Sequence, residues 1–258
     1  MAGSKSIWPN GCLGALSLTF DDGMESQLKV ALPLLDGFGF HATFYLNPRG
    51  EEWRELLEPW REAAAEGHEI GNHTLSHPCS ANFSGDPNGP GLESMELKDI
   101  RDDILEAQRR LDEAFPDQGE RTFCYPCYQS FVGRGRTRQS YVPIVAENFI
   151  AARGRGEVAN HPAACDLLYL CSWPVERASG PELVGLAERT TQGRWGILTF
   201  HGIEQGHLPV ADVDFRELLE FLGNNERRVW VAPVVEVARR IVDWRKENGY
   251  DFQDRKSD

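Results

Sequence analysis

The segment Gly14-Ala-Leu-Ser-Leu-Thr-Phe-Asp-Asp-Gly23 decides the fold class. Its first seven residues are mostly apolar, which predicts a buried strand, and Asp21-Asp22-Gly23 ends the strand with residues that favour turns. Residues 27–35 follow with helical spacing of their apolar side chains, and residues 39–46 (GFHATFYL) have the composition of a second strand. A buried strand, a helix and another strand predict the beginning of a parallel α/β sheet.

The same alternation continues along the chain. Further strands are predicted at residues 68–71, 122–125, 149–152, 167–171, 195–201 and 229–232, and further helices at residues 53–65, 96–115, 181–190, 213–222 and 234–244. About eight strands without a glycine-rich G-x-G-x-x-G after the first one favour a (β/α) barrel over an open sheet. Residues 78–94 are rich in Pro, Gly, Asn and Ser and predict a long surface loop. Because no linker or repeat interrupts the pattern, we expect one domain over residues 1–258.

The composition excludes several classes of partner. With 41% hydrophobic and 26% charged residues, the chain has the composition of a globular protein, and no apolar run approaches the ~20 residues that span a bilayer. A formal net charge of −13 disfavours nucleic acid and anionic membranes, and it suits a neutral or cationic substrate. Residues 1–6 contain no apolar segment typical of a signal peptide, so we expect either an intracellular protein or a secreted one whose leader was removed.

The six cysteines do not form a metal-binding pattern by spacing. Cys124 and Cys127 form a C-x-x-C, but a zinc ribbon needs a second close pair, and Cys165 and Cys171 are too far apart. We therefore expect buried, inert thiols, with a redox pair at Cys124 and Cys127 as the alternative.

Three polar clusters follow predicted strands, at the end of a parallel barrel where catalytic groups converge. The first cluster is Asp21-Asp22. Adjacent carboxylates at a strand end point in different directions, so one of them can bind a metal ion while the other accepts a proton. By itself, however, Asp-Asp-Gly is also ordinary turn chemistry.

The second cluster is His73-Thr-Leu-Ser-His77. The i, i+4 spacing lets two imidazoles converge on one ion if the segment turns helically. With one carboxylate this gives a His₂Asp site that keeps positions open for water and substrate, and such a site lowers the pKa of water and polarises a carbonyl group. Two surface histidines in a polar loop are the alternative.

The third cluster is residues 195–202 (WGILTFHG), in which an apolar strand delivers His201 to the same end of the barrel. There the imidazole could protonate a leaving group. A lone histidine at this position would more often be structural, but the three clusters together rarely arise from unrelated features.

The motifs TFDDG at residues 19–23 and GHEIGNHTLSHP at residues 67–78 closely resemble those of the polysaccharide deacetylase family, the NodB homology domain of carbohydrate esterase family 4. The resemblance runs from residues 8–11 to residues 229–233. It implies a distorted (β/α) barrel of seven to eight parallel strands that hydrolyses acetyl groups on sugars. It also implies one divalent ion, usually zinc with cobalt or another ion accepted, bound by Asp22, His73 and His77.

The resemblance also implies roles in proton transfer, with Asp21 as the catalytic base and His201 as the general acid. The third motif of the family often reads Arg-Pro-Pro-Tyr-Gly, and its arginine orients the base, but residues 123–128 (FCYPCY) lack that arginine. Some relatives supply an arginine after the next strand, which is where Arg153 lies, so we predict the orienting role for Arg153. A surface arginine near a turn is the alternative.

Three further substrate contacts are predicted from the same resemblance. The fourth family motif, an Asp and Trp pair, is not recognisable, and Ser172-Trp173-Pro174 matches it best. Trp173 would form one wall of the substrate groove, with a buried core tryptophan as the alternative. Tyr125 would line the groove, and the backbone N–H of Cys127 is the candidate oxyanion donor.

The sequence thus predicts a metal-dependent hydrolase that removes acetyl groups, foremost N-acetyl, from a polysaccharide or oligosaccharide. The enzymatic alternative is a related amidohydrolase that acts on a small cyclic amide or ureide. The second alternative is a carbohydrate-binding protein that has lost catalysis, which only the missing third-motif arginine supports.

Overall fold

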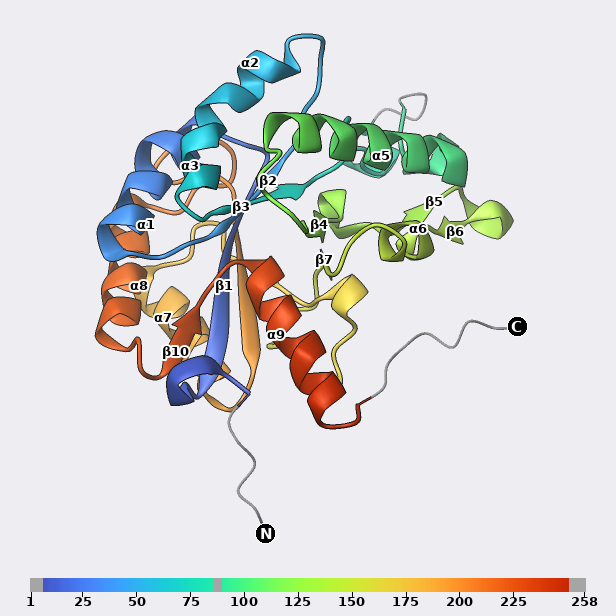
Figure 1. The fold of residues 1–258 in the computed structure, drawn as a ribbon. Coiled ribbons are helices and arrows are strands. Elements are labelled where there is room, and N and C mark those ends of the chain that lie inside the picture. The colour runs from blue at the N-terminus through green and yellow to red at the C-terminus, as the bar shows by residue number, and fades with distance from the viewer. Residues whose placement is uncertain (1–6, 86–89, 251–258) are drawn as a thin grey trace.

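The computed structural model describes residues 7–85 and 90–250 (Figure 1). The expectations for residues 1–6 and for residues 86–89 of the predicted loop lie outside the described residues. Within the described part, one sheet of eight parallel strands is surrounded by helices. No helix in this part of the chain is both long and apolar enough to cross a bilayer.

The strands of the main sheet follow the order β7-β4-β3-β2-β1-β9-β8, and β10 also pairs with β1. Their bounds are β1 (Gly14–Asp21), β2 (Thr43–Leu46), β3 (Glu69–Asn72), β4 (Phe123–Cys124), β7 (Ala152–Arg153), β8 (Trp173–Pro174), β9 (Trp195–Phe200) and β10 (Val229–Val231). A short antiparallel pair, β5 (Phe131–Val132) and β6 (Gln139–Ser140), lies apart from this sheet.

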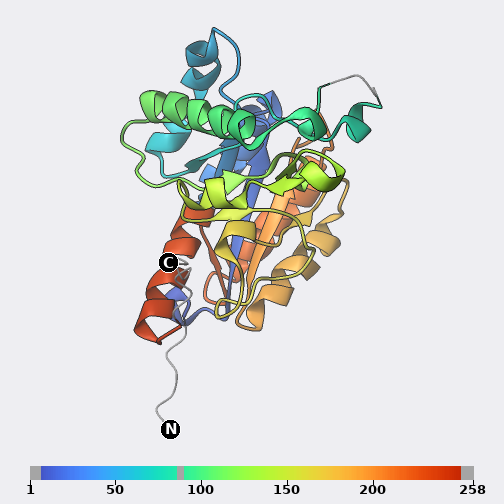
Figure 2. The same cartoon turned by 90° about the vertical axis from the view of Figure 1, so that its right-hand side faces the viewer.

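The helices connect and cover these strands. They are α1 (Leu32–Phe38), α2 (Trp53–Leu57), α3 (Arg61–Ala65), α4 (Ala81–Ser84), α5 (Leu97–Ala114), α6 (Val142–Ala146), α7 (Gly180–Glu188), α8 (Asp212–Asn224) and α9 (Val234–Glu247). In Figure 1, α1, α7 and α8 cover one side of the sheet and α5 lies above β3 and β4. Figure 2 shows the sheet between α7 on one side and α9 on the other.

Strand β1 is the centre of the sheet and is buried along its whole length. On one edge it pairs with β9. On the other edge it pairs first with β10 and then with β2, because β10 meets residues 14–16 and β2 meets residues 19–21. A strand covered on both faces requires a nearly continuous apolar sequence, which is what the segment 14–20 provides.

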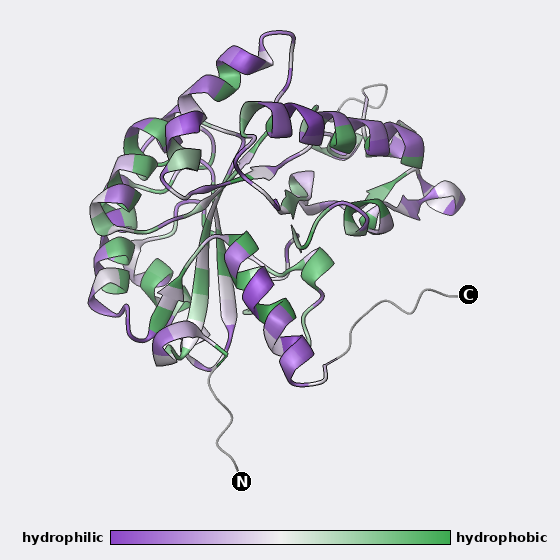
Figure 3. Ribbon diagram, viewed as in Figure 1, coloured by the Kyte–Doolittle hydropathy of each residue, from purple (hydrophilic) through white to green (hydrophobic). Residues whose placement is uncertain are grey.

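The two faces of β1 serve different purposes. Leu16, Leu18 and Phe20 belong to the main hydrophobic core under the surrounding helices, and Figure 3 shows that apolar and hydrophilic residues alternate along these helices. By the two-residue period of a strand, Ser17, Thr19 and Asp21 point to the opposite face. That face is the interior of the barrel, which is apolar beside Trp195 and Ile197 and polar beside Thr199 and Asp21, where it leads to the predicted site.

The sheet curls so that its two ends approach each other. Strands β7 and β8 are the first and last in the path, yet Leu170 forms a parallel bridge with Arg153 of β7. Ser172, just before β8, donates a hydrogen bond to the carbonyl of Gly154 at 2.6 Å. These contacts close the sheet and confirm the predicted distorted (β/α) barrel of seven to eight parallel strands.

Three predicted elements are corrected. Of the strand predicted at residues 149–152, only Ala152 lies in a strand, β7. The strand predicted at residues 167–171 is wrong, because Leu167–Tyr169 is a 3-10 helix. Asp166 starts this turn by accepting a hydrogen bond from the N–H of Leu168 at 2.8 Å, and the strand begins later, at β8. The predicted helix 53–65 is divided into α2, a 3-10 turn and α3, since Pro59 has no N–H to continue the α-helical ladder.

Candidate metal and catalytic site

The two carboxylates at the end of β1 lie in different environments. Asp21 is the last residue of the strand and is buried, with its side chain in the barrel interior. Asp22 has a left-handed backbone (φ 74°), a conformation that Asp tolerates better than most residues, and its side chain is half-buried. Its N–H donates to the carbonyl of Tyr45 at 3.1 Å, which fixes the turn. The chain therefore directs Asp21 and Asp22 to different sides.

The histidines come from the loop that follows β3. The i, i+4 spacing predicted a helical turn between the two histidines, but the segment is not helical. Instead, Thr74 (φ 65°) and His77 (φ 54°) adopt left-handed backbone conformations. Asn47, after β2, holds the first part of the loop by donating to the carbonyls of His73 and Thr74. These bonds and the two positive φ angles bring the imidazoles together without a helical turn.

Helix α5 holds the middle of the same loop. The Asp103 carboxylate accepts hydrogen bonds from the N–H of Leu75 at 2.7 Å and from the N–H and hydroxyl of Ser76 at 3.2 and 2.5 Å. Three donors on one carboxylate restrain the loop between His73 and His77. The position of the second histidine thus depends on a residue of α5.

Asp22, His73 and His77 form a compact donor set. The Oδ1 atom of Asp22 lies 3.6 Å from Nε2 of His73 and 3.4 Å from Nε2 of His77. The three ligand atoms all lie within 4.8 Å of one another. Two imidazole nitrogens and one carboxylate oxygen are a donor set that suits zinc and leaves positions open for water and substrate.

His73 is prepared for a ligand role by its surroundings. Its Nδ1–H faces the carbonyl of Cys124 at 3.0 Å, so Nε2 carries the free lone pair. Burial lowers the pKa of His73 to about 4, although the nearby carboxylates of Asp21 and Asp22 oppose this shift. The ring is therefore neutral at pH 7, the form that binds a metal ion.

Asp21 forms a buried ion pair with Arg153 of β7. The Nη2 atom of Arg153 lies 2.6 Å from Oδ1 and 2.5 Å from Oδ2 of Asp21. Burial by itself would raise the pKa of Asp21, but the charge of Arg153, helped by His73 and His201, outweighs it and holds the pKa below its usual value. Asp21 is therefore ionised at neutral pH.

A chain of hydroxyl groups holds the other side of the guanidinium. Nη1 of Arg153 donates to Thr199 Oγ1 at 2.6 Å, and Thr199 donates to Ser172 Oγ at 3.2 Å. All three side chains are buried. Arg153 Nη2 also lies 2.6 Å from the sulfur of Cys124, within the run 123–128 that lacks the third-motif arginine. The guanidinium thus reaches the interior from β7.

Sequence reasoning missed Thr199 and named Ser172 only as the neighbour of a tryptophan. Their signal was weak, because each is a small polar residue in or next to an apolar strand. Their contact with Arg153 depends on the curl of the sheet, which brings β7, β8 and β9 together.

His201 follows β9 and lies on another side of Asp22. Its Nε2 is 3.9 Å from Asp22 Oδ2, and its side chain is 16% exposed. Gln27 donates to the carbonyls of both Asp21 and His201, at 2.6 and 3.0 Å. This amide therefore ties the end of β1 to the end of β9 and fixes the base and acid candidates relative to each other.

The two aromatic residues predicted to contact substrate, Trp173 and Tyr125, are buried. Trp173 is 5% exposed and belongs to the main hydrophobic core. Tyr125 is 1% exposed, and its hydroxyl donates to the carbonyl of Leu168 at 2.8 Å. Both side chains are packed in the hydrophobic core, so the structure does not place them as walls of a groove.

Cys127 lies in a 3-10 turn after β4 with a left-handed backbone (φ 50°). Its N–H is in the first turn, where amide groups have no partner within the helix. Its sulfur forms a disulfide with Cys79, which corrects the expectation of inert thiols and excludes the Cys124–Cys127 pair in this structure. The other four cysteines, all within the described part of the chain, are not disulfide-bonded.

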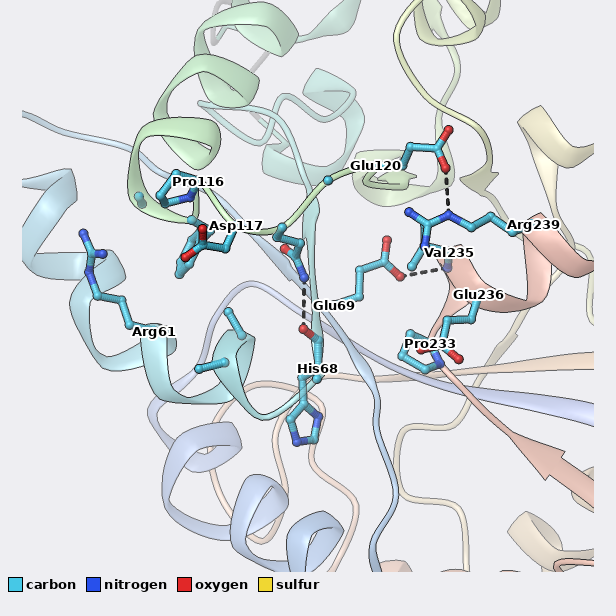
Figure 4. Close-up of a pocket in the computed structure, with 17 residues that line it drawn as sticks. Arg61, His68, Glu69, Pro116, Asp117, Glu120, Pro233, Val235, Glu236 and Arg239 are labelled. Carbon is cyan, nitrogen blue, oxygen red and sulfur yellow. Dashed lines mark hydrogen bonds and ion pairs between the residues drawn. The ribbon is translucent and has the colours of Figure 1, made fainter.

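A cavity of about 590 Å³ lies at the opposite end of the barrel, beside the first residues of β3 (Figure 4). Its buried carboxylate, Glu69, accepts hydrogen bonds from the N–H groups of Thr122 and Val235 at 2.8 and 3.0 Å. Arg239 and Glu120 form an ion pair at its edge. In (β/α) barrels this end contributes stability rather than catalysis, and every Glu69 bond here joins structural elements.

The chain is similar to known deacetylases in sequence. Residues 12–131 match the family described as polysaccharide deacetylase. The chain is 30% identical to a chitooligosaccharide deacetylase of Sinorhizobium fredii over 116 residues, which are 44% of this chain and 47% of that protein. It is 31% identical to a gellan lyase of a Bacillus species over 153 residues, which are 58% of this chain and 5% of that protein. The chain thus spans less than half the length of these curated relatives.

Solved structures share the fold at lower identity. A peptidoglycan deacetylase from Bacillus subtilis superposes with a TM-score of 0.56 at 16% identity, over 92% of this chain and 95% of that chain. A pseudoenzyme of carbohydrate esterase family 4 from Bacillus anthracis gives a TM-score of 0.56 at 16% identity, over 87% and 65%. At such identities the likeness concerns the fold alone. Taken together, these findings show that residues 12–131 resemble the polysaccharide deacetylase family in sequence and that the chain shares the fold of solved structures of that family.

Proposed function

We propose that this chain is a metal-dependent hydrolase that removes acetyl groups, foremost N-acetyl, from a polysaccharide or oligosaccharide. The observation that supports the proposal is that two adjacent carboxylates, Asp21 and Asp22, contact different partners. Asp22 lies with two histidines in a donor set for a metal ion, while Asp21, its chain neighbour, is paired with a buried arginine. Ligand set and base are thereby adjacent in one interior.

Asp22, His73 and His77 would hold the divalent ion, with zinc first and cobalt as a substitute. When bound, such an ion polarises a carbonyl group and makes water acidic enough to react at neutral pH. The chain contributes the geometry, because the loop of the two histidines is fixed by Asn47 and Asp103.

Asp21 would accept the proton of the attacking water. The Arg153 guanidinium keeps the Asp21 carboxylate ionised and oriented. A carboxylate whose pKa is held low is a weaker base, but it stays in the accepting form over a wider pH range. This arrangement supports the role predicted for Arg153.

His201 would supply the proton to the departing amine or alcohol. Its ring lies across Asp22 from the histidine loop and is partly exposed, so a substrate can approach it. The N–H of Cys127 would donate to the oxyanion that forms on the acetyl carbon, as in other acyl-transfer sites. The proposed base then lies at the end of β1, the proposed acid follows β9, and the proposed oxyanion donor lies in the turn after β4.

The alternatives have less support. The binding-protein hypothesis rests on the missing third-motif arginine, and Arg153 brings a guanidinium to Asp21 from β7. No feature of the described residues favours a small cyclic amide over a glycan.

The test is acetate release from chitooligosaccharides, peptidoglycan fragments and acetylxylan, using chelator-stripped protein with zinc or cobalt restored. We expect release that depends on the ion and is lost in His73→Ala. His161→Ala, a change at an exposed histidine, is the matched control and keeps the activity. Protein that binds the ion but releases no acetate from any member of the panel would contradict the proposal.

A further inference from the structure

A disulfide lies directly beside the proposed metal ligands. Cys79 and Cys127 are 48 residues apart in sequence, and their Cα atoms are 5.8 Å apart. Cys79 follows the histidine loop, and Cys127 lies in the turn after β4. Both residues are half-buried rather than enclosed in the core. A small reagent can therefore approach this bond from solvent.

His77 faces the disulfide with one ring nitrogen and Asp22 with the other. Its Nε2 lies 3.4 Å from Asp22 Oδ1, and its Nδ1 lies 3.6 Å from the sulfur of Cys79. The ligand atoms of His77, Cys79 and Cys127 lie within 4.8 Å of one another, as do those of Asp22, His73 and His77. Two possible ligand sets thus meet at one imidazole.

We propose that reduction of the Cys79–Cys127 disulfide creates a second metal site, formed by the two sulfurs and His77. The ligand would be zinc or another divalent ion that prefers sulfur. Two cysteines and one histidine with one open position are a known zinc donor set, and thiolates select such ions more strongly than a carboxylate does. This inference rests on the proposed function in one respect: the proposed catalytic metal site and the second site both include His77.

The chemical step is a thiol–disulfide exchange with a dithiol as reductant. One thiolate of the reagent attacks one sulfur of the disulfide, and the other cysteine leaves as a thiolate. The second thiol of the reagent then displaces the first cysteine and closes the reagent into its own disulfide. Two electrons and two protons pass from the dithiol to Cys79 and Cys127. When the ion binds, the two thiol protons are released to solvent.

The thiol state would then decide where the ion lies. With the disulfide closed, the sulfurs are unavailable, and His77 can serve only the site with Asp22 and His73. With the disulfide open, an ion bound by Cys79 and Cys127 draws on Nδ1 of the same imidazole, and a neutral imidazole has a free lone pair on only one of its two nitrogens. The His₂Asp site would then compete for one of its three ligands, and we expect it to bind its own ion less tightly.

The test is a cobalt titration of chelator-stripped protein in two states, oxidised and reduced by dithiothreitol that is then removed without air. Thiolate-bound cobalt shows an intense near-ultraviolet charge-transfer absorption that nitrogen and oxygen ligands do not give. We expect this absorption only in the reduced protein, with two additional titratable thiols beyond the four cysteines that are not disulfide-bonded. It should be lost in Cys79→Ser and Cys127→Ser and kept in Cys171→Ser, a change at a free cysteine elsewhere.

Reduced protein that gains two thiols but shows no such absorption would overturn the proposal, as would an absorption that persists in Cys79→Ser. The readout does not require hydrolysis. Acetate release by the oxidised, cobalt-loaded protein reports separately on the proposed deacetylase function. Failure of one proposal can therefore be told apart from failure of the other.

Discussion

At the scale of single residues, two neighbouring carboxylates of the candidate site have different surroundings. Asp21 and Asp22 are adjacent in sequence, yet one is buried against a guanidinium and the other is half-buried among histidines. A left-handed backbone at Asp22 produces this difference. Under the proposed function, one strand end would therefore supply both a base and a metal ligand, and the partner of each carboxylate would set its chemistry.

The first prediction concerns Arg153. Arg153→Ala removes the positive charge that lowers the pKa of Asp21, so that pKa rises, and the acidic limb of the kcat/KM profile moves to higher pH. We expect turnover at neutral pH to fall by about 100-fold, at the lower end of the contribution of acid–base groups. Metal content, measured by atomic absorption, should stay at the wild-type level.

The matched control for this change is Arg239→Ala, which removes an exposed arginine paired with Glu120 at the far end of the barrel. Its profile should follow that of the wild type. An Arg153→Ala protein with an unshifted acidic limb would remove Arg153 from the mechanism.

The second prediction concerns Thr199. Thr199→Val keeps the shape but deletes the hydroxyl that accepts from Arg153 Nη1, leaving a buried donor without this acceptor. We expect the free energy of unfolding to fall by about 1–3 kcal/mol in urea denaturation. Turnover should fall less than in Arg153→Ala, because the bonds to Asp21 remain. Thr199→Ser should restore both quantities; a Val variant as stable as wild type would show that the hydroxyl contact contributes nothing.

At the scale of elements, local sequence predicted the long elements better than the short ones. Strands β1 and β9 and helix α5 were predicted because each carries its own apolar pattern. In α5 that pattern includes Ile100, Ile104, Ala107 and Leu111, which are buried. The two-residue strands β4, β7 and β8 depend on pairing with distant segments, so their bounds could not be predicted from local pattern.

The candidate ligands were predictable because they lie in two short motifs with characteristic spacing. The residues that hold these ligands in place could not be predicted from the sequence. The loop that carries His73 and His77 takes its shape from Asn47 and Asp103, which come from other elements. The Cys79–Cys127 bond joins residues that only the folded chain brings together. The spacing of residues in a motif indicates which side chains can bind an ion. Contacts with distant parts of the chain determine how those side chains are held.

The third prediction tests the contact between α5 and the histidine loop. Asp103→Ala removes the acceptor of three hydrogen bonds, so the loop samples other conformations and His77 is less well placed. We expect zinc affinity, measured by competition with a chromophoric chelator, to fall by about 10-fold, the lower end for residues that orient ligands. Asp102→Ala, on the same helix but exposed and paired with Lys98, is the control. Equal affinities in the two variants would refute the role of Asp103.

At the scale of the whole molecule, the two ends of the barrel carry different groups of polar residues. The carboxyl ends of the strands carry the ligand set and the Asp21–Arg153 pair, whereas the other end contains the cavity around Glu69 and His68. His68 is buried and uses both ring nitrogens, since Nδ1 accepts from the N–H of Ala42 at 3.1 Å and Nε2 donates to Asp36 at 3.0 Å. The neutral ring thus connects β2, β3 and α1.

The fourth prediction follows from this histidine. Burial holds the pKa of His68 below its usual value of about 6.5, although Asp36 opposes the shift. As pH falls below that value, the unfolded chain takes up a proton that the folded chain does not, so the free energy of unfolding decreases. Protonated Nδ1 would also lose the bond from Ala42.

The measurement is urea denaturation of metal-free protein at pH 7.5 and 5.5. The wild type should lose more stability on acidification than His68→Gln, whereas the exposed His161→Gln should behave like the wild type. Equal losses in wild type and His68→Gln would contradict the assignment.

The order of the site residues along the chain has a consequence for recombination. Asp21, Asp22, His73 and His77 all precede the β5–β6 hairpin, while Arg153, Thr199 and His201 follow it. A chimaera with its crossover in this hairpin would inherit the proposed metal ligands and the proposed base from one parent, and the guanidinium and the proposed proton donor from another. Exchange between relatives at this point would vary the partner of Asp21 and the proton donor, while the proposed coordination sphere is inherited intact.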